Sequence, residues 1–326
     1  MGLLITISLF LAACAGTATR LPEISAPALR AESLRQEVQA LGTQTAHLER
    51  LNRVGRPILE ANAEICPKTR KDLGLRLHQE DSYPKELRLA AQRELGASAE
   101  PSVAYIVPGG PADRAGFAVG DVILIEGQPV DSKDRRLEEL LLMETVTLTV
   151  RRQDSLLNLS VTPGTVCQSR LRLQTSSAIN AFANGRSITV TTGMMDFAKS
   201  DDELAMIIGH ELAHNTMGHI RKVIGNLILS GFSTRYTRPF ESEADYVGLY
   251  YMVRAGYNPD EVEELWRRLA DVDPRSVNRA KTHPTFPDRY LRIAASRDEI
   301  RAKQAAGEPL IPNFKSKETD EDSPNG

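Results

Sequence analysis

The chain opens with an almost continuous apolar run and then alternates between apolar and polar positions. The run covers residues 2–13, "GLLITISLFLAA", and Cys14 follows it directly. A helix that spans a bilayer needs roughly 20 apolar residues, so this run is too short to do so. Its length is that of the apolar part of a signal peptide. Residues 1–13 are therefore predicted to be a signal segment.

The end of this run, Leu11-Ala12-Ala13-Cys14, resembles a bacterial lipobox. The resemblance implies that Cys14 is diacylated, becomes the first residue of the mature chain, and anchors the protein to a membrane by lipid. The next residues, Ala15-Gly16, lack the aspartate that retains such lipoproteins at the inner membrane. The resemblance thus implies a bacterial cell-envelope protein, an outer-membrane lipoprotein that faces the periplasm.

Residues 14–67 are predicted to form a tether and an N-terminal helix. Residues 15–27 contain Pro22, Pro27 and several small residues, and apolar residues then recur near helical spacing over about 28–54. The apolar stripe is narrow and Gly42 interrupts it, so packing on a larger body is favoured over a dimeric coiled coil. The apolar positions are Leu29, Leu34, Val38, Leu41, Leu48 and Leu51.

Residues 68–165 change to short apolar runs separated by turns, which predicts a β-rich domain. The order of strands and the stretch "PGGPADRAGFAVGDVI" resemble a bacterial PDZ domain. The resemblance implies that Leu73-Gly74-Leu75 is a loop whose backbone amides hold the terminal carboxylate of a peptide. An alternative is a PDZ-like unit that only braces its neighbour. The segment 82–95 predicts an inserted helix that could cover the peptide groove.

The two remaining cysteines, Cys66 and Cys167, lie on either side of this domain. An even number of cysteines in an oxidising compartment allows one disulfide, and the bracketing position favours it. Buried free thiols are the alternative.

Residues 166–302 are predicted to be mainly helical with one small β section, and residues 303–326 to be a disordered tail. Asn184-Gly185 lies between two short apolar runs, which is a strong hairpin signal. The fold class is thus α+β, in which a PDZ-like β-rich domain precedes a helical one.

The stretch "HELAHNTMGH", residues 210–219, carries the candidate chemistry. The sequence from Ser200 to Glu203 predicts a capped helix start just before it. Residues His210 and His214 are four apart on that helix, so both imidazoles can reach one ion at about 2 Å. Glu211 is placed to act on water rather than to bind the ion, which is the zincin arrangement. A pair of structural histidines is the alternative.

A catalytic zinc site needs a third protein ligand. The metzincin pattern fails, because Gly218 and His219 stand at the wrong spacing for it. The stretch "ESEAD" predicts a second helix on which Glu241 and Asp245 share a face. One carboxylate can bind zinc, and the other can accept the second N–H of a ligand histidine.

Four separated motifs, namely "NAFANGRSITVTTGMM", "HELAHNTMGH", "ESEAD" and "THPTFPDR", together resemble the gluzincin peptidases that include the CAAX prenyl endopeptidase, HtpX and BepA. The resemblance implies one zinc ion per chain on His210, His214 and Glu241. It implies that Asp245 supports a ligand and that Glu211 is the base. His283 and Arg289 are implied to lie near the metal and to stabilise the oxyanion. Residues Asn180, Ala181, Phe182 and Ala183 are implied to form the strand along which substrate lies, and His219 is interpreted as structural.

The composition limits the function further. A net charge of −3 with mixed signs along the chain excludes nucleic acid as a partner. Residues 220–238 hold only a short apolar stretch, which favours a lipid-tethered domain over an intramembrane protease. We therefore expect a zinc endopeptidase that cuts unfolded or misassembled envelope proteins and other extended polypeptides. The alternative is a non-enzymatic periplasmic chaperone or peptide-binding lipoprotein on the same fold. The sequence sets no oligomeric state.

Overall fold

The computed structural model describes residues 21–220, 238–272 and 286–313. The predicted lipidation residue Cys14, the loop residue His283 and residues 314–326 lie outside these ranges. The predicted disordered tail begins too early at residue 303, because residues 303–306 complete the last helix and Lys303 donates to the Ile311 carbonyl at 2.6 Å. Within them, the helices are too short or too polar for any to cross a membrane.

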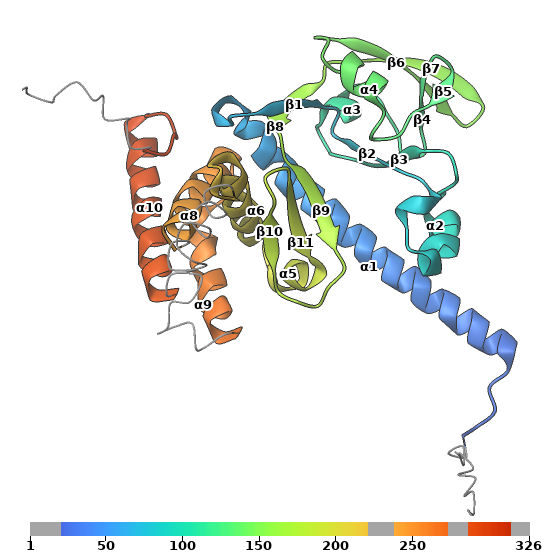
Figure 1. The fold of residues 1–326 in the computed structure, drawn as a ribbon, viewed down its shortest axis with the longest axis horizontal. Helices are drawn as coiled ribbons and strands as arrows, with labels where there is room; N and C mark the ends of the chain where they lie inside the picture. The colour runs from blue at the N-terminus through green and yellow to red at the C-terminus, as the bar shows by residue number, and fades with distance from the viewer. Residues whose placement is uncertain (1–20, 221–237, 273–285, 314–326) are drawn as a thin grey trace, which may run out of the picture.

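One long helix, α1 (Ala26–Ala61), runs beside both halves of the molecule (Figure 1). It begins at Ser25, whose side chain accepts a hydrogen bond from the Ala28 N–H. The sequence predicts an end near Val54, but the helix continues through Pro57. Proline inside a helix costs about 3 kcal/mol. Burial of the next two side chains, Ile58 and Leu59, offsets this cost.

The β-rich half contains three small sheets. Strand β1 pairs with β8, β2 pairs with β3, and a four-stranded sheet has the order β5-β4-β6-β7. Helix α2 packs its buried alanines on Leu41 of α1, so the predicted inserted helix lies against α1. The elements are β1 (Thr69–Asp72), β2 (Leu75–His78), α2 (Arg88–Leu95), β3 (Ser102–Ile106), α3 (Pro111–Arg114), β4 (Val122–Ile125), β5 (Gln128–Pro129), α4 (Arg135–Leu140), β6 (Val146–Arg152), β7 (Ser155–Val161) and β8 (Gly164–Cys167).

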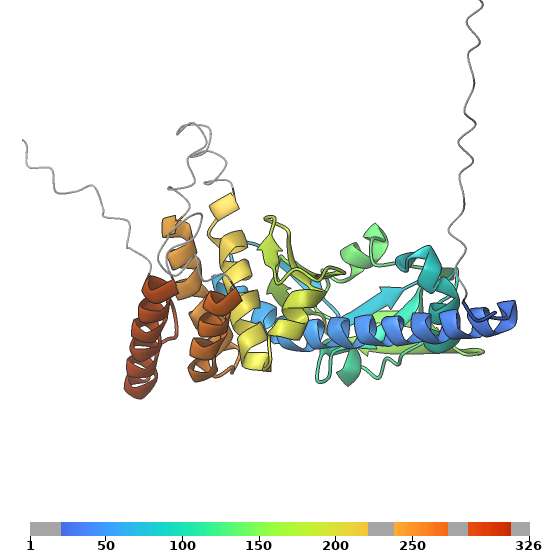
Figure 2. The ribbon, with the colours of Figure 1, turned by 90° about the horizontal axis from the view of Figure 1, so that it is seen from below.

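The other half is a helical layer against a three-stranded sheet (Figure 2). The predicted hairpin is present: β10 pairs antiparallel with β11, and Gly185 at its turn has a left-handed φ of 86°. Strand β9 pairs parallel with β11, which leaves β10 at the edge. The elements are β9 (Arg170–Gln174), β10 (Ala181–Ala183), β11 (Ser187–Thr191), α5 (Thr192–Phe197), α6 (Asp201–Thr216), α8 (Arg238–Arg254), α9 (Val262–Val272) and α10 (Phe286–Ala306).

The two halves share α1. Its buried residues Leu51, Val54 and Ile58 belong to the same apolar core as α6 and α8. A disulfide between Cys66 and Cys167, with Cα atoms 5.6 Å apart, ties the segment after α1 to β8. The β-rich half has its own core around Ile123, Leu148 and Val150. The helical half therefore rests on a helix that also reaches the β-rich half.

Candidate metal centre

Helix α6 presents the two motif histidines from a capped and buried start. The Ser200 hydroxyl accepts a hydrogen bond from the Glu203 N–H, 3.2 Å away. The Glu203 carboxylate accepts from the Lys199 N–H at 2.7 Å and pairs with Arg268. These hydrogen bonds and the ion pair hold the first turn of α6 in place. Residues 203–213, which follow it on the same helix, are all buried.

Helix α8 meets α6 at a contact between two glycines. A Cβ atom placed on Gly209 would lie 2.5 Å from the Gly248 carbonyl oxygen. A Cβ on Gly248 would lie 2.6 Å from the backbone nitrogen of His210. Because neither glycine has a side chain, the two backbones touch. This close approach brings the acidic start of α8 beside the histidines of α6.

Three side chains from these helices converge on one point. The Nε2 atoms of His210 and His214 lie 3.1 Å apart. Oε2 of Glu241 lies 3.5 Å from His210 Nε2, and Oε1 of Glu241 lies 3.6 Å from His214 Nε2. Tetrahedral ligands at 2.0–2.1 Å from zinc are separated by about 3.3 Å. The donor types and their spacing therefore fit a zinc ion, and these three residues form the donor triangle.

Behind the donor triangle, a buried carboxylate fixes His210. Asp245 Oδ1 lies 2.9 Å from His210 Nδ1, on the side of the ring away from the triangle. Arg289 donates to both Asp245 oxygens from Nε and a terminal nitrogen, each at 2.7 Å. The guanidinium also stacks 3.8 Å from the centre of the Trp266 ring. Such a held carboxylate sets the tautomer and orientation of a metal-binding imidazole.

A second support acts on His214, and the sequence reasoning missed it. His219 is fully buried, and its Nδ1 lies 3.0 Å from Nδ1 of His214. Its Nε2 lies 2.8 Å from a Glu243 oxygen, and its ring stacks on Phe240. The turn after α6 at Gly218, with φ 67°, carries His219 back toward α6. Its five-residue offset from His214 leaves the helical i+4 pattern, so the spacing alone gave no signal.

The charges in this cluster favour a cation. Burial lowers the pKa of His210, but hydrogen bonds with Asp245 and Glu241 outweigh it and raise the pKa to about 10. Burial and the neighbouring His210 lower the pKa of His214 to about 3. Burial raises the pKa of Asp245, but Arg289 and His210 bring it below its ordinary value.

The predicted catalytic residues and the predicted substrate strand lie around the donor triangle or outside the described residues. Glu211 is buried on α6, next to the donor triangle, where its charge raises the pKa of His210 and Arg289. Arg289 lies behind the triangle and is committed to Asp245, so its geometry gives it a holding role. His283, the other residue to which the resemblance gives an oxyanion role, lies outside the described residues. The predicted substrate strand is the edge strand β10, and Phe182 on it is 39% exposed.

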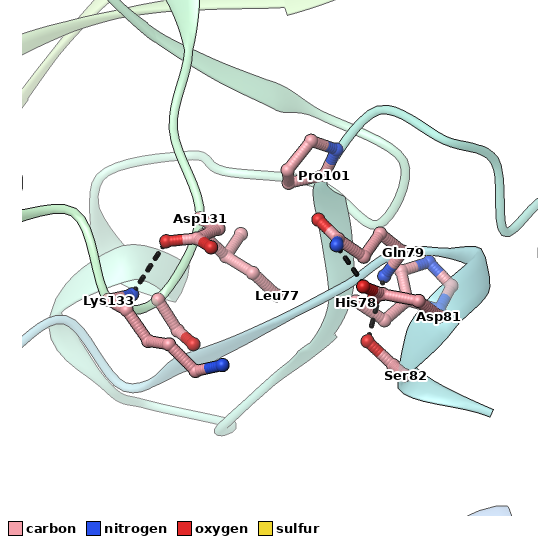
Figure 3. A pocket seen from close by; sticks show the side chains of 9 residues that line it. Leu77, His78, Gln79, Asp81, Ser82, Pro101, Asp131 and Lys133 are labelled. Carbon is pink, nitrogen blue, oxygen red and sulfur yellow. Dashed lines mark hydrogen bonds between the residues drawn. The ribbon is translucent and has the colours of Figure 1, made fainter.

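The predicted peptide loop lies at the start of β2. Gly74 has a left-handed φ of 75°, and its N–H donates to the Asp72 carboxylate at 2.7 Å. Among the described strands, β2 pairs only with β3, so its other edge has no partner strand. At the far end of β2 a polar cavity of about 210 Å³ lies between His78, Asp131 and Lys133 (Figure 3).

Family models match two parts of the chain. The model of peptidase family M48 matches residues 168–230 and 223–297, which include the donor triangle. This segment is a peptidase family M48 domain. The PDZ domain model matches residues 102–152. The chain therefore combines a PDZ domain with an M48 domain, as the motifs predict, and its fold class is α+β.

Several curated proteins resemble part of the chain. Mitochondrial metalloendopeptidase OMA1 of Schizosaccharomyces pombe is 26% identical over 42% of this chain and 50% of that protein. The putative beta-barrel assembly-enhancing protease of Vibrio cholerae is 29% identical over 42% of this chain and 35% of that protein. Metalloprotease LoiP of Escherichia coli is 24% identical over 38% of this chain and 61% of that protein. The chain thus spans half or less of the length of the OMA1 and Vibrio cholerae proteins.

Two solved structures also match. The HtrA3 PDZ domain bound to a phage-derived ligand (FGRWV) is 25% identical and covers 30% of this chain and 89% of that chain, with a TM-score of 0.23. The HtrA-type protease AlgW with a decapeptide is 28% identical and covers 30% of each chain, also with a TM-score of 0.23. At these TM-scores, the PDZ assignment rests on the family match.

Proposed function

We propose that the protein is a zinc-dependent endopeptidase. The observation that carries this proposal is the donor triangle of His210, His214 and Glu241, whose spacing fits one zinc ion per chain. The membership of this segment in peptidase family M48 supports it. The supports behind both histidines also favour a metal, because each ligand imidazole has a partner on its second nitrogen.

Each residue of the site would have a separate role in peptide-bond hydrolysis. Zinc, when bound, lowers the pKa of water toward about 7 and polarises a peptide carbonyl. Glu211 takes the proton of the attacking water and passes it to the leaving amine. Asp245, held by Arg289, keeps the Nδ1 proton on His210, so that Nε2 stays free to bind. His283 would hold the developing oxyanion.

The substrates we propose are extended polypeptides, including unfolded or misassembled proteins of the bacterial cell envelope. Strand β10 is at a sheet edge and contacts α6, the helix that carries both histidines, which supports this proposal. An edge strand can pair with an extended chain, whereas a folded domain hides its backbone. The envelope location is supported by the Cys66–Cys167 disulfide, by the lipobox resemblance at Cys14, and by the bacterial relatives.

We propose that the PDZ domain selects substrates or regulates access by binding peptide ends at Leu73-Gly74-Leu75. The unpaired edge of β2 and the polar cavity at its far end support this role. Residues 68–165 would form this unit and residues 166–302 the peptidase unit. A lipid on Cys14 would hold both at the outer membrane.

One experiment tests the central claim. Zinc content and casein cleavage are measured on the chain that starts after Cys14, in the wild type and in Glu211→Gln. About one zinc per chain in both, with cleavage in the wild type only, is the expected result. Zinc in both without cleavage in either favours a chaperone or peptide-binding role. Absence of zinc from both would overturn the proposal.

A further inference from the structure

The peptide loop of the PDZ domain already holds a carboxylate from within the chain. The Asp72 side chain occupies it: Oδ1 accepts from the Gly74 N–H at 2.7 Å and also from Arg56 NH1. Oδ2 accepts from Arg70. Both oxygens of Asp72 are thus engaged, and its side chain is only 14% exposed. The groups around it form a ready-made carboxylate site.

The cation in this site comes from outside the PDZ domain. Arg56 lies on α1 and is 6% exposed. Two of its nitrogens, Nε and NH2, are buried and have no hydrogen-bond partner among the residues that the structure describes. A guanidinium has five N–H donors arranged as a fork that matches a carboxylate. Among the described residues, Arg56 therefore has two unpaired donors on the guanidinium whose NH1 already binds Asp72.

Two glycines make room for this arginine. A Cβ atom on Gly74 would lie 2.5 Å from Arg56 NH1, and one on Gly164 would lie 3.3 Å from NH2. The guanidinium thus lies between the peptide loop and β8, in space that a side chain at Gly74 would occupy and one at Gly164 would crowd. Burial lowers the pKa of Arg56, and the charges of Asp72 and Glu60 counteract this effect. The carboxylate of a bound peptide would therefore face a guanidinium that packing already holds in position.

We propose that Arg56 completes the peptide loop as the counter-charge for the C-terminal carboxylate of an extended peptide, and that Asp72 occupies this site until such a peptide displaces it. The proposal deepens the proposed peptide-binding role of the PDZ domain and rests on it. It does not depend on the metal chemistry. Asp72 is then an internal competitor that sets the affinity of the site.

An extended peptide is the occupant that suits the surroundings of the loop. Strand β2 begins directly after Gly74, and one of its edges has no partner strand among the described residues. Its four residues span about 10 Å at 3.3 Å per residue. A peptide that pairs antiparallel with β2 and ends at Gly74 would bring an upstream side chain to the polar cavity near Asp131 and Lys133 (Figure 3). The loop and the cavity thus mark the two ends of one strand-shaped site.

The test compares free and amidated peptide ends on the full mature chain. Immobilised protein in EDTA is exposed to an equimolar mixture of randomised hexapeptides, half with a free carboxylate and half with a C-terminal amide. Mass spectrometry then gives the ratio of retained acids to amides. We expect the acids to be enriched, and Asp72→Asn to raise their enrichment about tenfold, since a charge-assisted bond no longer competes. The exposed turn variant Asp154→Asn serves as the matched control and leaves the ratio unchanged.

The role of Arg56 is tested in the same assay. Arg56→Met lowers the ratio to near one. The double variant Arg56→Met/Asp72→Asn, which keeps the local charge balanced and so protects folding, gives the same result. Enrichment that survives in a normally melting double variant overturns the role of Arg56. An unchanged ratio in Asp72→Asn overturns the role of Asp72. Equal retention of acids and amides by the wild type and Asp72→Asn overturns the site itself, and the casein result is unaffected by any of these outcomes.

Discussion

The Nδ1 atom of His219 lies 3.0 Å from the Nδ1 atom of His214. Because Nε2 of His214 belongs to the donor triangle, a metal-binding His214 carries its proton on Nδ1 and donates it to His219. His219 then donates from Nε2 to Glu243, 2.8 Å away. This relay mirrors the one from His210 through Asp245 to Arg289. Each histidine of the triangle is thus oriented by its own chain of partners.

The relay predicts a loss of zinc affinity when its far end is changed. Glu243→Gln removes the negative charge that orients His219, while the side chain keeps its size. Partners of this kind contribute 10–100-fold to metal affinity. We expect the zinc dissociation constant, measured by competition with a chromogenic chelator, to rise by about tenfold with little change in melting temperature. The exposed acid Glu264 of α9 provides the control, and an equal affinity in Glu243→Gln and Glu264→Gln would contradict the relay.

The Arg289–Asp245 pair predicts a stability effect that separates it from surface ion pairs. Arg289→Met leaves the buried Asp245 carboxylate without its main partner. Breaking a buried pair from one side costs about 3–5 kcal/mol. We expect the free energy of unfolding in urea to fall by about that amount, and the double variant Arg289→Met/Asp245→Asn to recover part of it.

A matched control lies one turn further along α10. Arg292 pairs with Asp288 at 3.0 Å, and the Arg292 side chain is 60% exposed. Exposed pairs of this type contribute at most about 1 kcal/mol. Arg292→Met should therefore change the free energy of unfolding little. Equal losses in the two single variants would show that the Asp245 carboxylate is not buried as described.

Much of this site could be predicted because its signals are local. The cap at Ser200 and the turn at Gly185 each depend on a few neighbouring residues. The extension of α1 to Ala61 could not be predicted in this way, because burial of Ile58 and Leu59 in a distant core outweighs the local effect of Pro57. The position of Arg56 likewise depends on packing between segments far apart in the sequence. Gly209 and Gly248 lie inside predicted helices, where no turn or cap requires a glycine. A glycine at such a position indicates close packing against another segment, and this was the sequence signal for their contact.

The disulfide predicts a loss of stability on its removal. Cys66 and Cys167 are 101 residues apart, so the bond closes a long loop of the unfolded chain. The chain-entropy estimate for such a loop is about 4.7 kcal/mol. We expect Cys66→Ala/Cys167→Ala to unfold at lower urea concentration, with a loss of about 2–5 kcal/mol. The untreated and the reduced wild type are compared alongside, and reduction should reproduce the loss.

The contact between α6 and α8 predicts opposite effects for two similar glycine substitutions. In Gly248→Ala the new methyl group would lie 2.6 Å from the His210 nitrogen, so the helices must move apart. Overpacking of this kind costs about 1–3 kcal/mol, and the movement separates Glu241 from the histidines. We expect a lower melting temperature together with a lower zinc affinity. Gly42→Ala in α1 meets nothing within 4 Å and should stabilise the helix by about 0.5–1 kcal/mol, without any effect on zinc. If Gly248→Ala left zinc affinity unchanged, the close approach of the two backbones would not be what sets the donor triangle.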